Sequence, residues 1–386
     1  MTTAPPQGSL GAGPGALDGV RIADFSRVLA APYATMLMAD LGAEVIKVER
    51  PDGGDETRAW GPPWSDDGES TYFLSVNRNK ESRVLDLRSD DDRAVAVDLV
   101  AHCDVVVENF RSGTMDRLGL GYEELCAVNP GLVYCSVTGF GSGHGAALPG
   151  YDLVAQAVGG LMSVTGSTDS GPMKTGVALV DIITGLHATI GILAALRHRD
   201  HTGEGQQVEV NLLSSLLSAL SNQASTHVVT GAVPQAMGNT HPSIAPYEVL
   251  ATADRPLAVA AANDKLFGLL ASGVGRPELG ADPRFASNAA RVEHRAVLVA
   301  ELEAVLTEHG ADHWFAVLSE QGVPCGPIND IGQAFDLARR LGLDPVREII
   351  APGRAPVPTV AHPIGFSRTP AAHTAPPPPF VPGEAT

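Results

Sequence analysis

The chain has 386 residues, of which 44% are hydrophobic and 18% are charged, and its formal net charge is −18 at pH 7. This length exceeds what one hydrophobic core usually holds, so it predicts two domains, and the hydrophobic share excludes a disordered chain. The negative charge argues against nucleic acid as the main partner, because phosphate backbones attract basic surfaces.

Targeting and redox features predict a cytoplasmic protein. Residues 1–15 lack a basic start and an apolar segment, so we expect a flexible tail there and no signal peptide. The most apolar stretch, 182–196, is too short and too interrupted to span a bilayer, which predicts no membrane partner. The cysteines show neither CxxC pairing nor metal-ligand spacing, so free thiols and no metal site are expected. They are Cys103, Cys126, Cys135 and Cys325.

Strands alternate with helices in the first part of the chain. Strands are expected at 20–25, 44–49, 82–86, 104–108 and 131–137, and helices at 31–41, 91–102 and 122–128. This alternation indicates an α/β fold with a parallel sheet and crossover helices.

The residue pattern of the chain changes after Thr230. Before that point, helical patterns cover 151–161, 181–199 and 212–229, and a strand pattern covers 206–211. Beyond it, turn formers fill 231–246, a strand is expected at 257–262, and helices at 263–274 and 292–309. We therefore expect a large domain over 16–225, a smaller domain over 226–324, and a return to the large domain over 325–386. That last range ends in an extended, proline-rich tail.

Asp181 is a lone acid in the apolar segment ALVDIITGL. A buried charge is costly unless it is paired or hydrogen-bonded. One interpretation is an N-cap for the following helix, since aspartate is favoured there. The other is a nucleophile, kept ionised by the helix dipole and by backbone N–H groups. The two interpretations are compatible.

Other polar groups allow a structural and a functional interpretation. Tyr151 and Asp152 in PGYDLVAQA start a helix after a Pro-Gly turn, and Asp152 is also a candidate second carboxylate. His144 lies in the loop TGFGSGHG, as surface or as a base. This loop does not match GxGxxG, but it follows a strand, where α/β sheets place ligands. Cys325 has no base nearby in sequence.

Basic residues recur in the first 117 positions of this acidic chain. Several follow predicted strands, where a phosphate-bearing ligand would bind, although solvated surface is the simple alternative for each. They are Arg27, Lys47, Arg50, Arg78, Lys80, Arg88, Arg111 and Arg117.

Several long segments, taken in order, resemble one family. They include LDGVRIADFSRVLAAPYATMLMADLGAEVIKVERPDGGDETR, VVVENFRSGTMDRLGLGYEEL, GVALVDIITGLHATIGILAAL and GVPCGPIND. Their order and spacing over about 17–382 resemble the class III (CaiB/BaiF-type) CoA-transferases. The resemblance implies an interlocked homodimer, whose subunits have a Rossmann-like large domain and a smaller inserted α/β domain.

The resemblance also implies roles for particular residues. The family's catalytic aspartate falls on Asp181, and an aromatic-acid pair of the active site falls on Tyr151 and Asp152. Where oxalate-using members have glutamine this chain has Leu29, and it lacks their glycine-rich flap, which argues against oxalate and formate as substrates. CoA contacts would fall on Val28, Arg50, Leu85, Arg88, Asn109, Phe110 and Arg117.

The expected function is that of an acyl-CoA:carboxylate CoA-transferase. It would move CoA between carboxylic acids through an aspartyl anhydride or thioester, with CoA as substrate and no tightly bound cofactor. A 2-methylacyl-CoA racemase is the first alternative, disfavoured because Tyr151 is a poor base at neutral pH. A non-catalytic acyl-CoA-binding paralogue is the second. A nicotinamide-dependent oxidoreductase is disfavoured by the absence of GxGxxG.

Overall fold

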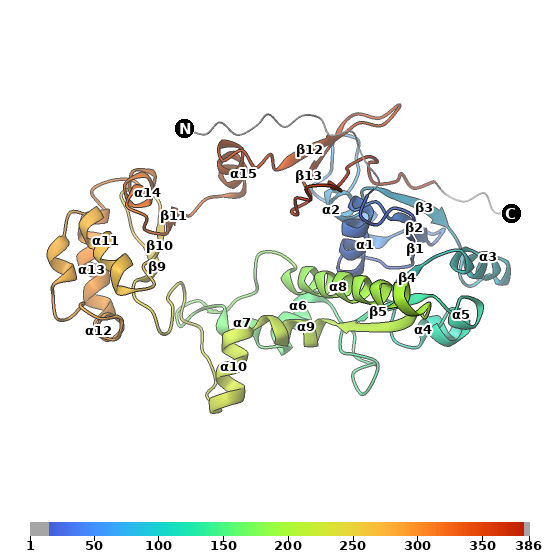
Figure 1. Ribbon diagram of the computed structural model, residues 1–386, viewed down its shortest axis with the longest axis horizontal. Coiled ribbons are helices and arrows are strands. Elements are labelled where there is room, and N and C mark those ends of the chain that lie inside the picture. Colours follow the sequence, from blue (N-terminus) through green and yellow to red (C-terminus); the bar gives the residue numbers. More distant parts are fainter. Residues whose placement is uncertain (1–14, 382–386) are drawn as a thin grey trace. The chain divides into compact units, whose positions relative to one another are not determined.

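The computed structural model describes residues 15–381, and the chain divides into two units (Figure 1). The first unit contains 15–161, 174–233 and 344–381, and the second contains 162–173 and 234–343. The main segment of the second unit, 234–343, begins and ends later than the range 226–324 that the sequence indicates, and the segment 162–173 was not expected in this unit. The first 14 residues of the expected tail lie outside the described part.

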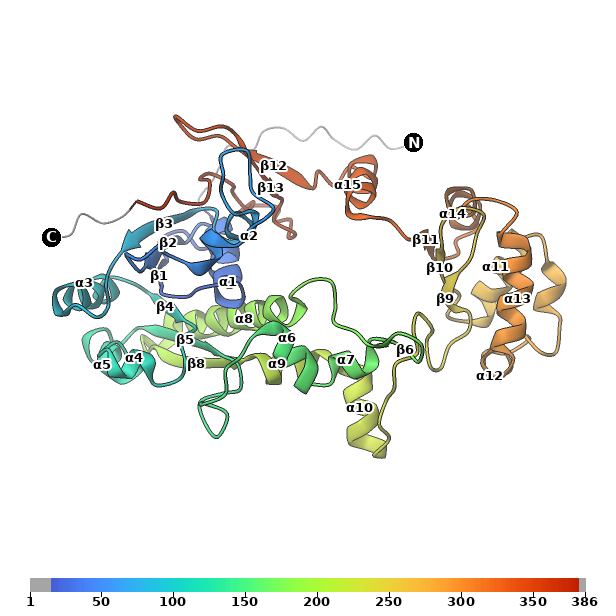
Figure 2. The ribbon, with the colours of Figure 1, turned by 180° about the vertical axis from the view of Figure 1, so that it is seen from behind.

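A six-stranded parallel sheet organises the first unit, which confirms the α/β fold class (Figures 1 and 2). Its strands, in spatial order, are β3 (Lys80–Val84), β2 (Glu44–Glu49), β1 (Arg21–Asp24), β4 (Val105–Glu108), β5 (Val133–Thr138) and β8 (Gln206–Asn211). The order reverses direction between β1 and β4. In doubly wound sheets, ligands bind beyond the carboxyl ends of the strands at such a switch point.

Helices cover both faces of this sheet, and the central strands are accordingly apolar on both faces. Ile22, Val105 and Val107 pack under α1 (Ala30–Asp40) and α8 (Leu179–Thr202). Ala23 and Val106, on the other face, pack against the layer that contains α3 (Asp90–Ala101) and α5 (Tyr122–Val128). Alternate residues of a strand point to opposite faces, so strands buried on both sides carry nearly continuous apolar runs.

Shorter elements surround this core. They are η1 (Glu56–Ala59), α2 (Thr71–Val76), α3 (Asp90–Ala101), α4 (Thr114–Arg117), α5 (Tyr122–Val128), α6 (Asp152–Val158), α9 (Leu212–Ala219), α10 (Ser221–Thr230), β12 (Val346–Ile349) and β13 (Val357–Val360). The prediction of one helix over 212–229 is wrong, because Ser221 adopts a φ of 46° and separates α9 from α10. Helix α2 was not predicted.

Helix α8 corrects an expectation about the apolar stretch at 182–196. The helix has 24 residues, so by length and composition alone it could cross a membrane. The core helix of a globular domain meets the same criterion, and α8 packs on α1, β5 and β8. Its buried face includes Val180, Ala188 and Ile192.

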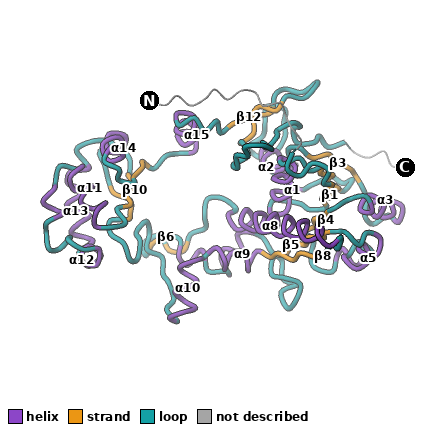
Figure 3. The backbone as a smooth tube through the Cα atoms, viewed as in Figure 1, coloured by secondary structure: helices purple, strands orange, loops and turns teal. Residues whose placement is uncertain are grey.

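The second unit has its own core and is mostly helical (Figure 3). Its three-stranded antiparallel sheet has the order β11 (Cys325–Pro327), β10 (Leu257–Ala260), β9 (Tyr247–Leu250). Its other elements are α7 (Leu161–Val164), β6 (Gly166–Ser167), β7 (Gly171–Pro172), α11 (Asp264–Gly273), η2 (Pro277–Gly280), α12 (Asn288–Glu293), α13 (Arg295–Leu306), α14 (Ala311–Glu320) and α15 (Ile331–Arg340). Leu298, Leu302 and Phe267 lie at the centre of this core.

Candidate active site

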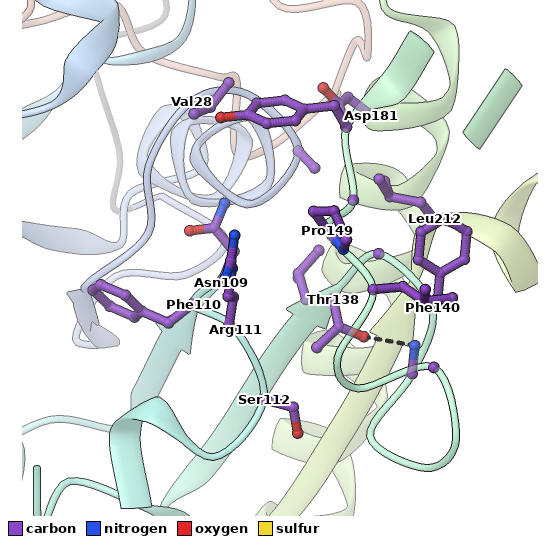
Figure 4. Close-up of a pocket in the computed structure, with 18 of the residues that line it drawn as sticks. Val28, Asn109, Phe110, Arg111, Ser112, Thr138, Phe140, Pro149, Asp181 and Leu212 are labelled. Carbon is purple, nitrogen blue, oxygen red and sulfur yellow. Dashed lines mark hydrogen bonds between the residues drawn. The ribbon is translucent and has the colours of Figure 1, made fainter. Parts of the chain in front are cut away.

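A cavity of about 220 Å³ opens at the switch point of the large sheet (Figure 4). Three segments beyond the carboxyl ends of strands line it: 27–30 after β1, 109–112 after β4, and 139–151 after β5, together with the last two residues of β5. Asp181 reaches the same cavity from the N-terminal end of α8. The topology therefore brings together Arg27 and Asp181, which are 154 positions apart in the chain.

Asp181 is the third residue of α8, and only 8% of its surface is exposed. The prediction that it caps the helix is wrong, because the N-cap position belongs to Ala178. Helices α8 and α1 cross closely, and this crossing positions Asp181 relative to the sheet. A Cβ atom on Gly185 would lie 2.4 Å from the carbonyl oxygen of Ala30, so only glycine allows this approach.

Asp152, the first residue of α6, takes the capping role instead. Its Oδ1 accepts hydrogen bonds from the backbone N–H groups of Val180, at 2.8 Å, and Asp181, at 3.2 Å. Its Oδ2 accepts from the Nε2 amide of Gln156 at 2.6 Å. Both oxygens are therefore engaged in holding the start of α8, and Asp152 does not line the cavity.

This arrangement changes the expected ionisation of Asp181. Burial, followed by the charge of Asp152, raises the pKa of Asp181 from 3.8 to about 7. The sequence suggested that the helix terminus would keep this carboxyl ionised, but Asp152 occupies the N–H groups of Val180 and Asp181. Asp181 is therefore a carboxyl that changes its charge near neutral pH.

The loop after β1 carries a strained residue beside the cavity. Val28 has a φ of 70°, a conformation that is costly for a β-branched side chain. Hydrogen bonds hold the backbone of the two preceding residues. Lys47 Nζ donates to the carbonyl of Ser26 at 2.8 Å, and Asn109 exchanges two hydrogen bonds with the backbone of Arg27. Lys47 is fully buried and pairs with Asp55 at 2.8 Å.

A second cavity, of about 290 Å³, lies beyond the carboxyl ends of β2 and β3. Arg50, Leu85, Arg88 and Phe110 line it. The two cavities share only the side chains of Arg27 and Phe110, and the Arg27 guanidinium lies 4.7 Å from the centre of the Phe110 ring. A long ligand could therefore occupy both cavities by passing this pair.

The structure separates the other predicted site residues. Val28, Asn109 and Tyr151 line the first cavity, whereas Arg117 lines neither and donates to the hydroxyl of Thr114. The Arg88 side chain is 75% exposed and pairs with Asp86 and Asp52.

Two residues with a predicted alternative role lie elsewhere. His144 is exposed and lines neither cavity. Cys325 lies in β11 of the second unit.

From the sequence, Tyr72 and Gln156 were given no role, and Arg27 and Arg111 were expected only as basic residues that could contact phosphate or lie on solvated surface. Arg27 and Arg111 line the first cavity. The charges of Asp181 and Asp152, after burial, help to raise the pKa of Tyr72 to about 12, so its phenol stays protonated near the site. Gln156 supports Asp152. Gln156 could have been found in the sequence as the one polar residue in the apolar run LVAQAV.

Comparisons with known proteins give this geometry a context. The profile of CoA-transferase family III matches residues 17–385. A succinyl-CoA:glutarate CoA-transferase of Mus musculus is 41% identical over 94% of this chain and 83% of its own length. An acetyl-CoA:oxalate CoA-transferase of Acetobacter aceti is 42% identical over 84% of this chain and 83% of its own. The crystal structure of a CaiB/BaiF family protein from Brucella suis superposes with a TM-score of 0.86 at 41% identity, covering 95% of this chain and 97% of that one.

Proposed function

This chain belongs to CoA-transferase family III and is an acyl-CoA:carboxylate CoA-transferase, and we propose that it transfers CoA through a covalent bond to Asp181. One observation carries this proposal. Asp181 is a largely buried carboxyl at the wall of a cavity at the switch point, and a second cavity beside it can accept the nucleotide end of CoA.

The position of CoA follows from the two cavities. The nucleotide would lie in the second cavity, where Arg50, Arg88 and Leu85 meet it, with Arg117 nearby on α4. The pantetheine arm would pass Phe110 and Asn109 and bring the thioester to Asp181. Guanidinium groups suit phosphate because they offer several donors in a planar fork.

The chemistry conserves the energy of the thioester. An Oδ atom of Asp181 attacks the thioester carbonyl, the C–S bond breaks, and CoA leaves as a thiolate, which gives an acyl-aspartyl anhydride. The thiolate then attacks the aspartyl carbonyl, which releases the first carboxylic acid and leaves an aspartyl-CoA thioester. The acceptor carboxylate attacks the carbonyl of this thioester, the C–S bond breaks, and CoA leaves again as a thiolate, which gives a new anhydride. Attack of the thiolate on the new acyl carbonyl gives the product acyl-CoA and restores Asp181.

Asp152 and Tyr151 take supporting roles in this scheme. Asp152 holds the start of α8, and its charge adds to the effect of burial in raising the pKa of Asp181 above that of an ordinary carboxyl. A more basic carboxylate is a better nucleophile once it is ionised. Tyr151, whose surface is 56% exposed, would cover the acyl group in the cavity and limit the access of water to the anhydride.

We propose carboxylic acids with a second carboxylate as substrates. The relatives from mouse and from Acetobacter are named for glutarate and oxalate, both dicarboxylic acids. Arg27 and Arg111 line the first cavity; the Arg27 Nη1 lies 3.4 Å from Glu56 Oε2, and within 15–381 Arg111 forms no ion pair. A cation can offset the desolvation of a remote carboxylate.

A comparison of acceptors tests this substrate class. Arg111→Ala should lower kcat/KM for a dicarboxylic acceptor by about tenfold or more, while a monocarboxylic acceptor of equal length changes less. Equal losses with both acceptors would contradict a role for Arg111 in recognising the second carboxylate.

We further propose a cytoplasmic homodimer. The four free cysteines fit a reducing compartment. Exposed apolar side chains on α6, α8 and α10, among them Val158, Ile190 and Val228, suit contact with a second copy. Sedimentation equilibrium should give twice the mass of one chain, and a concentration-independent single-chain mass would contradict the dimer.

Replacing the nucleophile tests the proposed function most simply. Asp181→Ala should lower transfer of CoA between carboxylic acids by about a thousandfold or more, because the covalent route is lost. Asp98→Asn is the matched control, since Asp98 is an exposed acid on α3 of the same unit. Retention of most activity by folded Asp181→Ala protein would refute the assignment.

A further inference from the structure

Gln156 is a fully buried amide in the second turn of α6. Its Nε2 donates to Asp152 Oδ2 at 2.6 Å, one helical turn earlier. Its Oε1 accepts from the backbone N–H of Thr175 at 2.9 Å and from the Thr175 hydroxyl at 3.3 Å. Burial of an amide is costly unless it is hydrogen-bonded, and these contacts satisfy both the Nε2 and the Oε1 of Gln156.

These bonds connect three separate segments. Gln156 holds Asp152 by one oxygen, and the other oxygen of Asp152 holds the backbone of Val180 and Asp181. On its other side Gln156 accepts from the backbone N–H of Thr175, and the single hydroxyl proton of Thr175 is shared between Gln156 Oε1 and the carbonyl of Val177, which lies 2.9 Å away. The chain that leads into α8 is thus fixed on both sides of Ala178.

Among residues 15–381, no side chain other than that of Asp152 accepts a hydrogen bond from the first-turn N–H groups of α8. Its N-cap residue, Ala178, has no side chain that could accept from the first turn. The orientation of Asp152 therefore sets where the N–H groups of α8 point. Because Asp181 lies in that same turn, an error in the orientation of Asp152 becomes an error in the position of the Asp181 carboxyl.

We infer that Gln156 is a positioning residue for CoA transfer: it orients Asp152 and, through Asp152, fixes Asp181 at the wall of the first cavity. This inference rests on the proposed role of Asp181 as nucleophile. Gln156 does not line the cavity, so its effect reaches the substrate only through the two aspartates.

The titratable groups around Asp181 make this inference testable by pH. Asp152 faces it from α6, the Tyr72 phenol from α2, and Tyr151 lines the same cavity. Gln156→Glu keeps an acceptor for Thr175 but places a second acid against Asp152. The added negative charge should move the pH at which Asp181 ionises upward, whereas Gln156→Leu removes the contact without adding charge.

Steady-state kinetics of both variants and a matched control test the inference. Gln156→Leu should lower kcat by about tenfold while KM for acyl-CoA changes less than about threefold. In the pH profile of kcat/KM, the acidic limb is the range in which the value rises with increasing pH. Gln156→Glu should shift this limb to higher pH. Gln207→Leu, which removes an exposed amide from β8 of the same unit, should leave kcat and the limb as they are in wild type.

The outcomes separate this inference from the proposed function. If wild type forms the Asp181 adduct but both Gln156 variants keep the wild-type kcat and pH limb, the inference about Gln156 fails alone. It also fails if the loss of activity matches the fraction of unfolded protein and the limb does not move. If wild-type protein transfers CoA without forming any adduct on Asp181, the proposed covalent role of Asp181 is contradicted, and the inference about Gln156 falls with it.

Discussion

Asp181 and Asp152 are carboxylates only 29 positions apart, yet their surroundings give them different tasks. Asp152 accepts three hydrogen bonds and holds the start of α8. The Asp181 carboxyl accepts none from residues within 15–381, and burial and the charge of Asp152 raise its pKa to about 7. Pairs of acids whose environments differ in this way commonly divide structural and chemical roles.

The pH dependence of the reaction should follow the ionisation of Asp181. Only the ionised carboxyl can attack, so kcat/KM should rise as the pH increases through about 7 and level off above it. Asp152→Asn keeps an oxygen that can accept from α8 but removes the charge. It should lower the pKa of Asp181 and move the limb to lower pH.

A second buried acid serves as the control for this measurement. Burial raises the pKa of Glu108 to about 7, and Glu108 lies below the loop after β4, where its Oε2 accepts from the Phe110 N–H. Glu108→Gln should keep the limb near pH 7. Disappearance of the limb in Glu108→Gln, with no shift in Asp152→Asn, would assign the ionisation to Glu108 and contradict the account of Asp181.

Ionisation of Asp181 should also cost stability. Its folded pKa lies above the ordinary value, so its favourable contribution is full below pH 3.8 and is lost as the pH rises through about 7. Asp181→Asn has no such loss. Its free energy of unfolding should exceed that of wild type at pH 8 by an amount on the order of 2–4 kcal/mol, with little difference at pH 4. Chemical denaturation at both pH values checks this, and a variant less stable than wild type at pH 8 would contradict it.

At the scale of elements, the crossing of α1 and α8 positions the nucleophile. Gly185 lies against the carbonyl of Ala30, so the first turn of α8 lies beside the loop after β1. Gly185→Ala should destabilise the protein by about 1–3 kcal/mol, because a Cβ cannot fit there. It should also lower activity, since α1 and the loop that contains Val28 must move.

A glycine in open space provides the control. Gly268 lies inside α11, and a Cβ there would meet no atom within 4 Å. Gly268→Ala should therefore raise stability by about 0.5–1 kcal/mol, since alanine restricts the unfolded chain and favours helix. Thermal unfolding of both variants checks the pair. A Gly185→Ala protein as stable and as active as wild type would show that the crossing is looser than described.

Sequence patterns predicted most elements of the sheet, because both continuous apolar runs and alternation of polar and apolar residues are typical of strands. The strands at 44–49 and 206–211 were predicted at their observed bounds. The third strand was predicted two residues late, at 82–86. Lys80 at its true start is charged, and only the structure shows it fully buried against Asp24 at 3.1 Å. The break at Ser221 depends on a local left-handed backbone that the pattern of side chains does not reveal.

At the scale of the whole molecule, the resemblance supplied the function, and the structure supplied the arrangement of the site. The family, the CoA-transferase activity and the α/β fold were predicted from the sequence and are confirmed. The capping of α8 by Asp152 was not predicted, because Asp152 contacts Val180 and Asp181, which follow it by 28 and 29 positions in the chain. The roles of the seven predicted CoA-binding residues stay predictions.

The central claim is a covalent intermediate on Asp181, and trapping it is the most direct test. Wild-type protein is mixed with an acyl-CoA without acceptor and quenched with hydroxylamine, which attacks activated acyl carbonyls. Peptide mass spectrometry should then find a hydroxamate at position 181, which is absent from Asp181→Asn protein. Wild-type protein that transfers CoA under the same conditions but carries the hydroxamate elsewhere, or nowhere, would contradict the account.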